Sequence, residues 1–515
     1  MSAAYKLEQA TATAPFSRSR DVFEALVVQA SSASALRGGH AELEATLLEK
    51  GRGLLRQLLQ DHLDLRSARE RDVKVVDQDG TGRAERRQGT RQLRSLLGPV
   101  VVTRRLYQQA GCEGRAPADA GLRLCEDSYS MGVRRQLAQL CANDAYAPAV
   151  ETLERLTGAH VGQRQAEELA RRAAEDVCQF YAERASEPVA EKSLLVLSFD
   201  AAGVVMRTSS LRPATRKKAE SELPAPPFPP KLGTGEKPNR KRMAQVGAVY
   251  AVEPFFRTAD DIVGELQSLA PTASNDGPSR PRPVNKRVFA SIARSAASVI
   301  DDGFRDALAR DPEGKHRWVV LLDGNGDQIR AARRAAKRAG VEITIVADLI
   351  HLIEYLWPAA YAFHPPGSDE AREWVVARVR ALLEGADPSQ VAAGMRRSAT
   401  LRNIKRRKAV DKCAQYMLKL APYMRYGQAL RDGLPIATGV IEGACRHLIR
   451  RRLGIGGARW TTAGAEAILL LRATVLSRDF DEYWAFHESQ VFRRTHQSKY
   501  RGAIPITQPV LRSVK

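Results

Sequence analysis

The sequence is poor in aromatic residues and cysteine, and it lacks any long uncharged apolar run. Phe, Trp and Tyr make up 6% of the 515 residues, and the six cysteines are scattered without a CxxC pair or other ligand spacing. We therefore expect reduced thiols rather than disulfides or zinc ligands. No apolar stretch reaches the roughly 18 residues that a membrane helix requires, and the first residues lack a signal peptide's apolar core. These absences predict a soluble, cytoplasmic protein with no membrane partner.

Acidic residues are too few to balance the basic ones. Lys and Arg number 80 against 59 Asp and Glu, which gives a net charge of +21. Hydrophobic residues at 44% and charged residues at 27% are ordinary globular usage and exclude wholesale disorder. The length accommodates about three domains. So basic a chain attracts polyanions, and nucleic acid is the first candidate partner.

The amino-terminal part is expected to be mainly helical. In residues 1–128, leucines between positions 43 and 59 recur at three- and four-residue spacing, which is typical of a packing helix, and residues 99–107 form a small β patch. Residues 129–190 are predicted to be helical and to contain a helix-turn-helix-like region, which would bind DNA.

The helix-turn-helix prediction depends on a short pattern around Gly158. Leu153 and Leu156 would pack the first helix, Gly158 would lie in the turn, and the second helix would be packed by Val161, Gln165 and Leu169. Three arginines would then face DNA phosphates: Arg164, Arg171 and Arg172. A plain helical hairpin explains the same pattern equally well.

Apolar runs alternate with helical segments in residues 191–350. Strands are predicted over 194–200, 244–253, 317–323 and 341–348, with helices over 285–309 and 327–339. This alternation favours an α/β fold with a mixed or parallel sheet. Three of the strands end in a carboxylate, at Asp200, Asp323 and Asp348.

Two segments interrupt this pattern. A basic, Pro-rich insertion over 208–243 is expected to lack regular structure and to be either a DNA-ordered loop or a solvated linker. Residues 351–435 form a helical insertion, followed by a Glu-bearing helix within 436–475 and a tail over 476–515. Positions 396–408 hold seven cations and no acid, which favours DNA contact over a solvated helix face. They are Arg396, Arg397, Arg402, Lys405, Arg406, Arg407 and Lys408.

The strand-ending carboxylates are the candidates for chemistry. Ligands of open α/β sheets gather at the carboxyl ends of strands, so Asp200 and Asp323 could converge. Two aspartates and one further carboxylate suffice to hold Mg²⁺ for phosphodiester cleavage. Glu442 is the third candidate. It follows a possible Thr438 cap on a helix with an apolar stripe, and Arg446 and Arg450 follow at i+4 steps. An ordinary Glu–Arg helix pair is the simpler explanation of this segment.

Several motifs in order resemble the Kra-type bacterial insertion-sequence transposases, over residues 85–490. The longest are Arg242-Met-Ala-Gln-Val-Gly-Ala-Val-Tyr250, Ala347-Asp-Leu-Ile-His-Leu-Ile-Glu-Tyr-Leu-Trp357 and Ala437-Thr-Gly-Val-Ile-Glu-Gly-Ala-Cys-Arg-His-Leu448. Phe199-Asp200, Leu322-Asp-Gly324, Gly457-Ala-Arg-Trp460, Ala463-Gly-Ala-Glu-Ala467 and Phe480-Asp-Glu-Tyr-Trp484 also belong to the set.

The resemblance implies a ribonuclease-H-like mixed sheet with a helical insertion, preceded by mainly helical DNA-binding regions. It places a DDE triad at Asp200, Asp323 and Glu442, with Mg²⁺, or Mn²⁺ in its place, as cofactor. The element Asp348–His351 is similar to the Asp/Cys-x-x-His element of Mutator-like transposases and is expected to have a supporting role.

The implied partner is double-stranded DNA, in the form of the element's terminal inverted repeats and the target. The family's mechanism implies strand hydrolysis at the element ends and attack of the exposed 3′-hydroxyl on target DNA. Arg446, Arg450 and Arg451 would hold phosphates. A nucleoid-associated homo-oligomer is expected.

Two other functions stay open. A tyrosine recombinase would use His447, Arg450 and Tyr483, but the residue expected several positions before the tyrosine is absent. A non-catalytic regulator would use the helix-turn-helix-like region alone, with a degenerate α/β scaffold.

Overall fold

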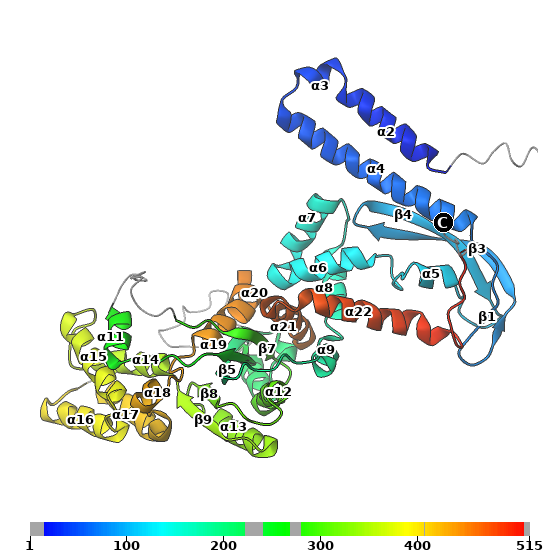
Figure 1. Cartoon of the computed structure of the whole chain (residues 1–515). Helices are drawn as coiled ribbons and strands as arrows, with labels where there is room; N and C mark the ends of the chain where they lie inside the picture. Colours follow the sequence, from blue (N-terminus) through cyan, green and yellow to red (C-terminus); the bar gives the residue numbers. More distant parts are fainter. Residues whose placement is uncertain (1–14, 222–239, 268–279, 406, 509–515) are drawn as a thin grey trace, which may run out of the picture. The chain divides into compact units, whose positions relative to one another are not determined.

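The computed structural model describes residues 15–221, 240–267, 280–405 and 407–508. The chain divides into two compact units, shown in Figure 1. The first unit comprises Met1–Phe180 and Phe480–Lys515, and the second comprises Tyr181–Asp479. Within the described ranges, no helix combines the length and apolarity needed to cross a membrane.

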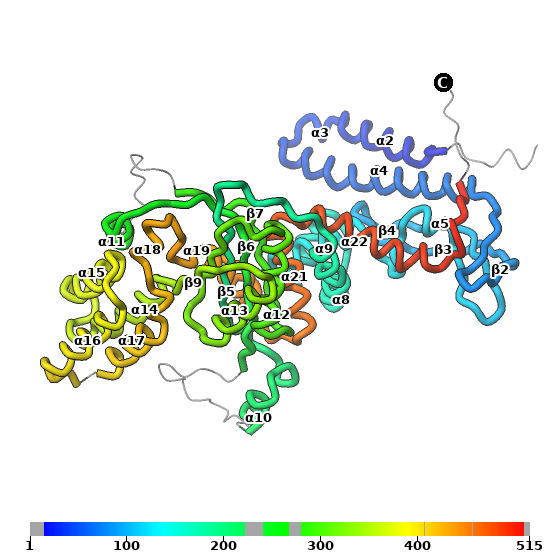
Figure 2. The backbone as a smooth tube through the Cα atoms, turned by 60° about the horizontal axis from the view of Figure 1, so that its bottom comes forward, coloured from blue at the N-terminus to red at the C-terminus, as the bar shows by residue number. Residues whose placement is uncertain are grey.

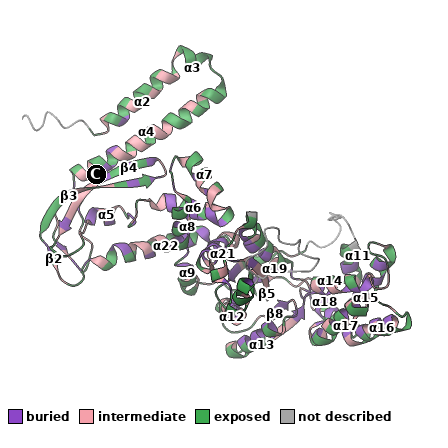
Figure 3. Cartoon of the chain, turned by 180° about the vertical axis from the view of Figure 1, so that it is seen from behind, coloured by how far each residue is buried: buried purple, intermediate pink, exposed green. Residues whose placement is uncertain are grey.

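A helical hairpin opens the first unit. Helix α2 (Ser17–Ala30) and helix α4 (His40–Ala68) flank the short α3 (Ala33–Arg37), which confirms the expected helices in the described part of 1–70. The Ser19 backbone amide donates to Asp61 Oδ2 at 3.0 Å and ties the two helices together. The expected leucine packing is only partly realised, because Leu47 and Leu55 are 40% and 49% exposed. Figure 3 shows the hairpin largely in the exposed and intermediate colours.

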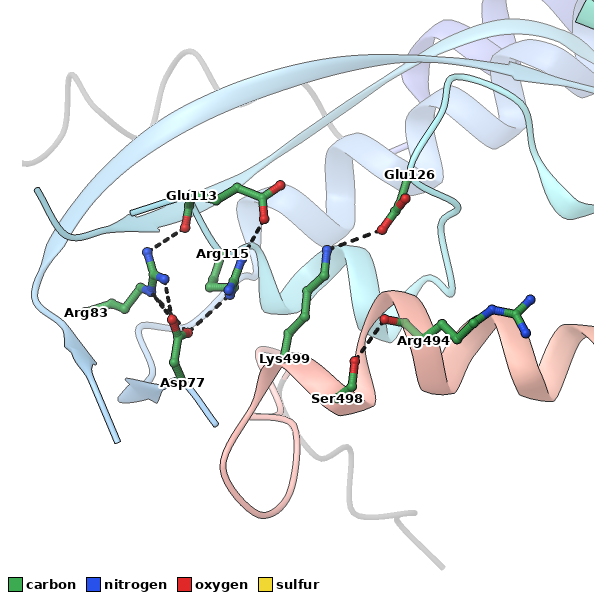
Figure 4. A network of polar contacts seen from close by, with 8 residues as sticks. All are labelled: Asp77, Arg83, Glu113, Arg115, Glu126, Arg494, Ser498 and Lys499. Carbon is green, nitrogen blue, oxygen red and sulfur yellow. Dashed lines mark hydrogen bonds and ion pairs between the residues drawn. The ribbon is translucent and has the colours of Figure 1, made fainter. Parts of the chain in front are cut away.

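A small antiparallel region follows the hairpin. Strands β3 (Glu85–Ser95) and β4 (Gly98–Gln108) pair along their whole length, and β1 (Val75–Val76) pairs with β2 (Gly82–Arg83). The predicted patch over 99–107 is confirmed as β4, whereas sequence analysis missed β3. Asp77 lies between Arg83 and Arg115 in a buried ion cluster next to these strands (Figure 4).

Helices complete the first unit from both ends of the sequence. They are α5 (Pro117–Gly121), α6 (Met131–Asn143), α7 (Tyr146–Thr157), α8 (Gln163–Ala173), α9 (Val177–Glu183), which ends in the second unit, and α22 (Phe480–Thr495), followed by η5 (Gln497–Lys499). The buried Asp176 contacts His487 Nδ1 at 2.7 Å and accepts from Arg494 at 2.6 Å. Burial acts to raise the pKa of Asp176, but the bonds from His487 and Arg494 outweigh it and the pKa is lowered. The expected tail over 476–515 therefore contains a packed helix.

A mixed five-stranded sheet forms the centre of the second unit. Its order is β7-β6-β5-β8-β9, in which β5, β8 and β9 are parallel and β6 runs antiparallel to β5 and β7. The strands are β5 (Leu194–Val205), β6 (Lys241–Val252), β7 (Val284–Ser291), β8 (Trp318–Leu322) and β9 (Ile343–Ala347). The α/β prediction is confirmed.

Two sequence predictions for this sheet are wrong in detail. Strand β5 continues for five residues beyond Asp200 instead of ending there. These residues, 201–205, pair with residues 241–245 at the start of β6. Residues 284–291 form the edge strand β7 rather than the start of a helix, and only α12 (Ala296–Arg310) is helical.

Helices cover both faces of the sheet. Phe199 faces α12, where a Cβ on Gly303 would lie 2.7 Å from the Phe199 ring, so glycine makes room for this contact. Side chains alternate along a strand, so Asp200 faces the other side. On that side, α19 (Gly439–Ala444) packs against β5 and β6, and α21 (Thr462–Ser477) packs against β7. Helix α13 (Gly326–Ala339) packs with α12.

The expected helical insertion is present between β9 and α19. It consists of α14 (Leu349–Ala360), α15 (Asp369–Leu383), α16 (Pro388–Leu401), α17 (Arg407–Leu420), η2 (Ala421–Tyr423) and α18 (Tyr426–Arg431). Helices α14 and α17 pack together, and the shared core includes Leu356, Met417 and Leu420.

The remaining short helices lie at the borders of these elements. Between β5 and β7 they are η1 (Thr208–Ser210), α10 (Pro213–Ser221) and α11 (Ala259–Gln267); after α19 they are η3 (Cys445–Arg450), α20 (Arg451–Leu453) and η4 (Ile455–Gly457). Helix α10, visible in Figure 2, lies in the segment predicted to lack regular structure. Residues 222–239 of that basic insertion lie outside the described residues.

Candidate active site

Asp200 lies on β5, and Asp323 directly follows the neighbouring strand β8. Phe199 of β5 is paired in register with Leu322, the last residue of the parallel strand β8. Asp200 directly follows Phe199 in the sequence, and Asp323 directly follows Leu322. Neighbouring strands lie about 4.8 Å apart, so the two aspartates are side by side. Both are half-buried. The predicted convergence of these two acids agrees with this register.

Glu442 lies on α19, close to the same position. One turn after it, the Cys445 thiol donates to Asp200 Oδ2 at 3.2 Å. Burial raises the pKa of the Cys445 thiol, and the charges of Asp200 and Glu442 raise it further. Both carboxylates are therefore near one buried thiol, and the helix brings the exposed Glu442 to the side of the sheet that Asp200 faces.

The arginines after Glu442 do not follow a regular α-helix. Residues Cys445–Arg450 form the π-helical segment η3, so the expected i+4 steps from Glu442 through Arg446 to Arg450 are interrupted. Arg446, Arg450 and Arg451 are nevertheless exposed. The positive charge of Arg450 opposes the rise in the pKa of the Cys445 thiol.

Asp348 fixes the start of the Glu442 helix. It is the N-cap of α14, with Oδ1 accepting from the Ile350 amide at 3.0 Å. Its other oxygen accepts from the Thr438 hydroxyl. The expectation that the Thr438 side chain caps α19 is therefore wrong, because its hydroxyl donates to Asp348 instead. The Glu442 amide donates to the Thr438 carbonyl, so Asp348 is connected to the first turn of α19.

Thr438→Val is expected to reduce the free energy of unfolding by about 1–3 kcal/mol at neutral pH, because a buried carboxylate loses a donor. Burial raises the pKa of Asp348, and the Thr438 bonds oppose this rise. The variant therefore raises the folded-state pKa further. A carboxyl whose folded-state pKa is raised costs stability when it ionises, so stability is lost as the pH rises above 3.8, the ordinary pKa of an aspartate. Urea unfolding at pH 4 and pH 8 should show the larger loss at pH 8.

Thr438→Ser is the matched control, since it keeps the hydroxyl and should unfold as the wild type does. Equal losses for the valine and serine variants, or a valine effect that does not change with pH, would contradict the proposed link to Asp348.

His351 belongs to an aromatic cluster beside Asp323. Its ring lies 5.7 Å from the Tyr416 ring, which stacks on Tyr355 at 4.3 Å. The Tyr416 hydroxyl donates to the Asp323 carbonyl at 3.0 Å. Burial raises the pKa of Tyr416, and the charges of Asp323 and Asp348 add to this rise. Tyr416 therefore lies between the second aspartate and the Asp348–His351 element. Sequence analysis missed it, since it lies 93 residues from Asp323 and carries no motif.

The donor atoms at this site suit a hard cation. Carboxylate oxygens are the ligands that Mg²⁺ and Mn²⁺ prefer, and the paired aspartates supply them. In the described ranges, no group of three His, Cys, Asp or Glu side chains is arranged as a ready-made metal cage. Mg²⁺ is usually held by one or two carboxylates together with water and substrate phosphates, so two adjacent aspartates fit this mode of binding.

The basic segment 396–408 lies at the corner between α16 and α17. Arg396 and Arg407 each approach Asp411 at 3.3 Å, so two of its cations are paired. Arg402, Lys405 and Lys408 are exposed and, among the described residues, form no ion pair. Arg406 lies outside the described residues. The segment is thus a helix corner, not one helix face, and its role in DNA contact remains a prediction.

The predicted helix-turn-helix region has the expected helices α7 and α8. Gly158 has a φ of 72° in the turn, and Leu153, Val161 and Leu169 are buried. Leu156 is 60% exposed and Gln165 is exposed, so the prediction that they pack the helices is wrong. Ala166 fills the place expected for Gln165. Three arginines were predicted to face outward: Arg164 and Arg171 are exposed, whereas the half-buried Arg172 pairs with Glu168 at 2.7 Å.

The geometry disfavours Tyr483 as a nucleophile. Its side chain is fully buried, and its hydroxyl donates to the Ala173 carbonyl. Burial raises the pKa of Tyr483 well above its ordinary value. A phenol that is neutral and hydrogen-bonded inside a core cannot reach a phosphodiester without unfolding its surroundings.

Glu466 is a further residue whose role the sequence did not reveal. It lies on α21 and accepts from the Ser291 hydroxyl at 2.6 Å and from the Ile292 amide at 2.7 Å. It thereby caps the end of the edge strand β7. The only signal in the sequence was that Glu466 belongs to the motif Ala463–Ala467, one of those that carry the family resemblance. Its partner Ser291 lies 175 residues away.

No family model matches the chain, and no curated protein matches it.

Proposed function

We propose that this protein is a DDE transposase of a bacterial insertion sequence. It would hydrolyse a DNA strand at the element ends and join the exposed 3′-hydroxyl to target DNA. One observation carries the proposal. Asp200 on β5 lies next to Asp323, which directly follows the parallel strand β8, and Cys445, one turn after Glu442, is hydrogen-bonded to Asp200.

The arrangement of the second unit supports a ribonuclease-H-like core. The first acid lies on the central strand β5, the second follows its parallel neighbour β8, and the third lies on a helix that packs against β5. The helical insertion α14–α18 accounts for the long separation between Asp323 and Glu442. A mixed sheet with acids at neighbouring strands is the setting that the resemblance implies.

Each residue has a defined task in this mechanism. Asp200, Asp323 and Glu442 would hold a pair of Mg²⁺ ions, or Mn²⁺ in their place. When bound, such ions activate water and stabilise the leaving oxygen. Arg446, Arg450 and Arg451 would bind phosphate oxygens and hold the scissile strand. Asp348 would act as a positioning residue through Thr438.

The charge of the chain agrees with a nucleic-acid partner. The net charge of +21 favours binding to the phosphate backbone, and α7–α8 supplies a two-helix unit with Arg164 and Arg171 exposed. The element's terminal inverted repeats and the target are the proposed duplexes, bound by a homo-oligomer.

The test is incubation with duplexes that carry the element's ends and flanking DNA. With Mg²⁺ or Mn²⁺, we expect strand cuts at the element boundary and joined products after target DNA is added; with EDTA, we expect none. Duplexes with scrambled ends are the matched control. Tight, end-specific binding without cutting in either metal would instead support a non-catalytic regulator based on α7–α8.

A further inference from the structure

A basic groove lies beside the candidate active site in the second unit. Its larger part is a cavity of about 770 Å³ bordered by β7, the N-terminal turn of α19 and the C-terminal end of α21. Six cationic side chains line it, against three acidic ones. The cations are Arg184, Arg282, Lys286, Arg287, Arg310 and Arg478.

A second cavity continues the groove. It has a volume of about 330 Å³ and is lined by Arg257, Arg280 and Phe255, among other residues. Both cavities include Arg282, Pro283, Gly439 and Val440 in their lining, so they adjoin. The result is an elongated depression with cations along its length, instead of a single enclosed pocket.

Only part of this positive charge is neutralised within the protein. Arg287 and Arg310 share Asp306, each at 2.8 Å. Arg282, Lys286 and Arg478 are exposed, and none of them has an ion pair within the described part of the chain. Clustered like charges repel each other, so these three cations favour an anion between them.

Two buried guanidinium nitrogens in the groove also lack protein acceptors. Among the described residues, Nε of Arg257 and Nε of Arg287 have no hydrogen-bond partner. Both guanidinium groups lie over aromatic rings, Arg257 over Phe255 at 5.3 Å and Arg287 over Tyr181 at 3.8 Å. Burial lowers the pKa of Arg257, and the neighbouring charge of Arg280 lowers it further. An incoming anion would relieve this repulsion.

The groove reaches the first turn of the helix that carries Glu442. Gly439 and Val440 in its wall form the first turn of α19, and Glu442 is two residues further along. Resting on the proposed function, we propose that the groove binds the phosphodiester backbone of a single DNA strand as it enters or leaves the site. Grooves that track single strands combine a line of positive charge with planar groups on which bases stack, and this groove contains both.

The experiment measures binding of the full chain to a fluorescent single-stranded oligothymidine in EDTA, by anisotropy at several salt concentrations. Each lost phosphate contact lowers the salt slope by about 0.7 on a single strand. Arg282→Ala/Lys286→Ala/Arg478→Ala should therefore lower the slope by about 2 and weaken binding at least about tenfold at 0.15 M salt. The charge reversal Lys286→Glu at an exposed position should act in the same direction.

The control removes equal charge elsewhere. Arg334→Ala/Lys337→Ala/Arg338→Ala alters exposed cations of α13 that do not line the groove, and it should leave the slope nearly unchanged. Wild-type binding and slope in both groove variants would overturn the inference, even if the protein cuts DNA. A weakened groove variant alongside a wild type that never cuts would sustain the groove and refute the transposase proposal.

Discussion

Replacing Asp200 with asparagine is expected to reduce Mg²⁺-dependent strand cleavage by about a thousandfold while DNA binding stays within about twofold. Metal-ion stabilisation of charge in phosphoryl chemistry contributes several kcal/mol, and about 4 kcal/mol corresponds to a factor of about 10³ in rate. The amide oxygen can still accept from the Cys445 thiol, so the contact between β5 and η3 is preserved. The measurement is the single-turnover cleavage rate, with duplex binding measured separately in EDTA.

Asp327→Asn is the matched control for this change. Asp327 lies on the first turn of α13, four residues after Asp323, is exposed and pairs with Arg330. It should cut at the wild-type rate. Glu442→Gln should behave as Asp200→Asn does. An Asp200→Asn protein that cuts at the normal rate would show that the acids are assigned to the wrong chemistry.

Asp77→Asn should destabilise the first unit by about 3–5 kcal/mol, since removal of one partner leaves a buried cation uncompensated. Asp77 accepts from Arg83 Nε at 3.0 Å and from Arg115 Nε at 3.1 Å (Figure 4). The side chains of Arg83 and Asp77 are only 1% and 9% exposed. Urea unfolding monitored by circular dichroism gives the free energy of unfolding of both proteins.

The pH dependence of this loss has a defined sign. The hydrogen bond from Arg83 lowers the pKa of Asp77 below its ordinary value of 3.8. The stability from Asp77 is thus present above pH 3.8 and is lost as the pH falls through the folded-state pKa. The gap between wild type and variant should close in acid.

Asp72→Asn offers a comparison with the same change in an exposed pair. Asp72 also contacts two arginines, Arg86 and Arg105, but its side chain is 44% exposed. Such pairs contribute about 0–1 kcal/mol. If both variants lost equal stability, burial would not be the cause of the Asp77 effect.

The strands that could be predicted are those with continuous apolar runs. Strands β5, β6, β8 and β9 lie in the core of the second unit, and their Val, Leu and Ile runs are visible in the sequence. Strand β7 begins with the exposed residues Val284, Asn285 and Lys286 and is apolar only in its second half, so it was merged with α12. Strand β3 contains four arginines and is mostly exposed, so its sequence lacks the apolar pattern that predicts a strand.

The candidate site was predictable in its acids but not in their supports. Asp200 and Asp323 were proposed because each follows an apolar run in the sequence, and Glu442 was proposed as a third carboxylate that the resemblance also implies. The bond between Asp348 and Thr438, the contact of Tyr416 with Asp323 and the thiol of Cys445 on Asp200 join residues 90, 93 and 245 positions apart. Local patterns carry no information about such pairs. The π-helical segment after Glu442 also breaks the spacing from which the arginine positions were predicted.

The discontinuous first unit imposes an order on biosynthesis. Its amino-terminal portion emerges from the ribosome first, but α22, which holds His487 and Arg494 against Asp176, is encoded after the whole of Tyr181–Asp479. At about 5–20 residues per second, the nascent chain waits about 15–60 s for this helix. During that interval Asp176 lacks its cationic neighbours, and the continuous second unit can fold before the first one is complete.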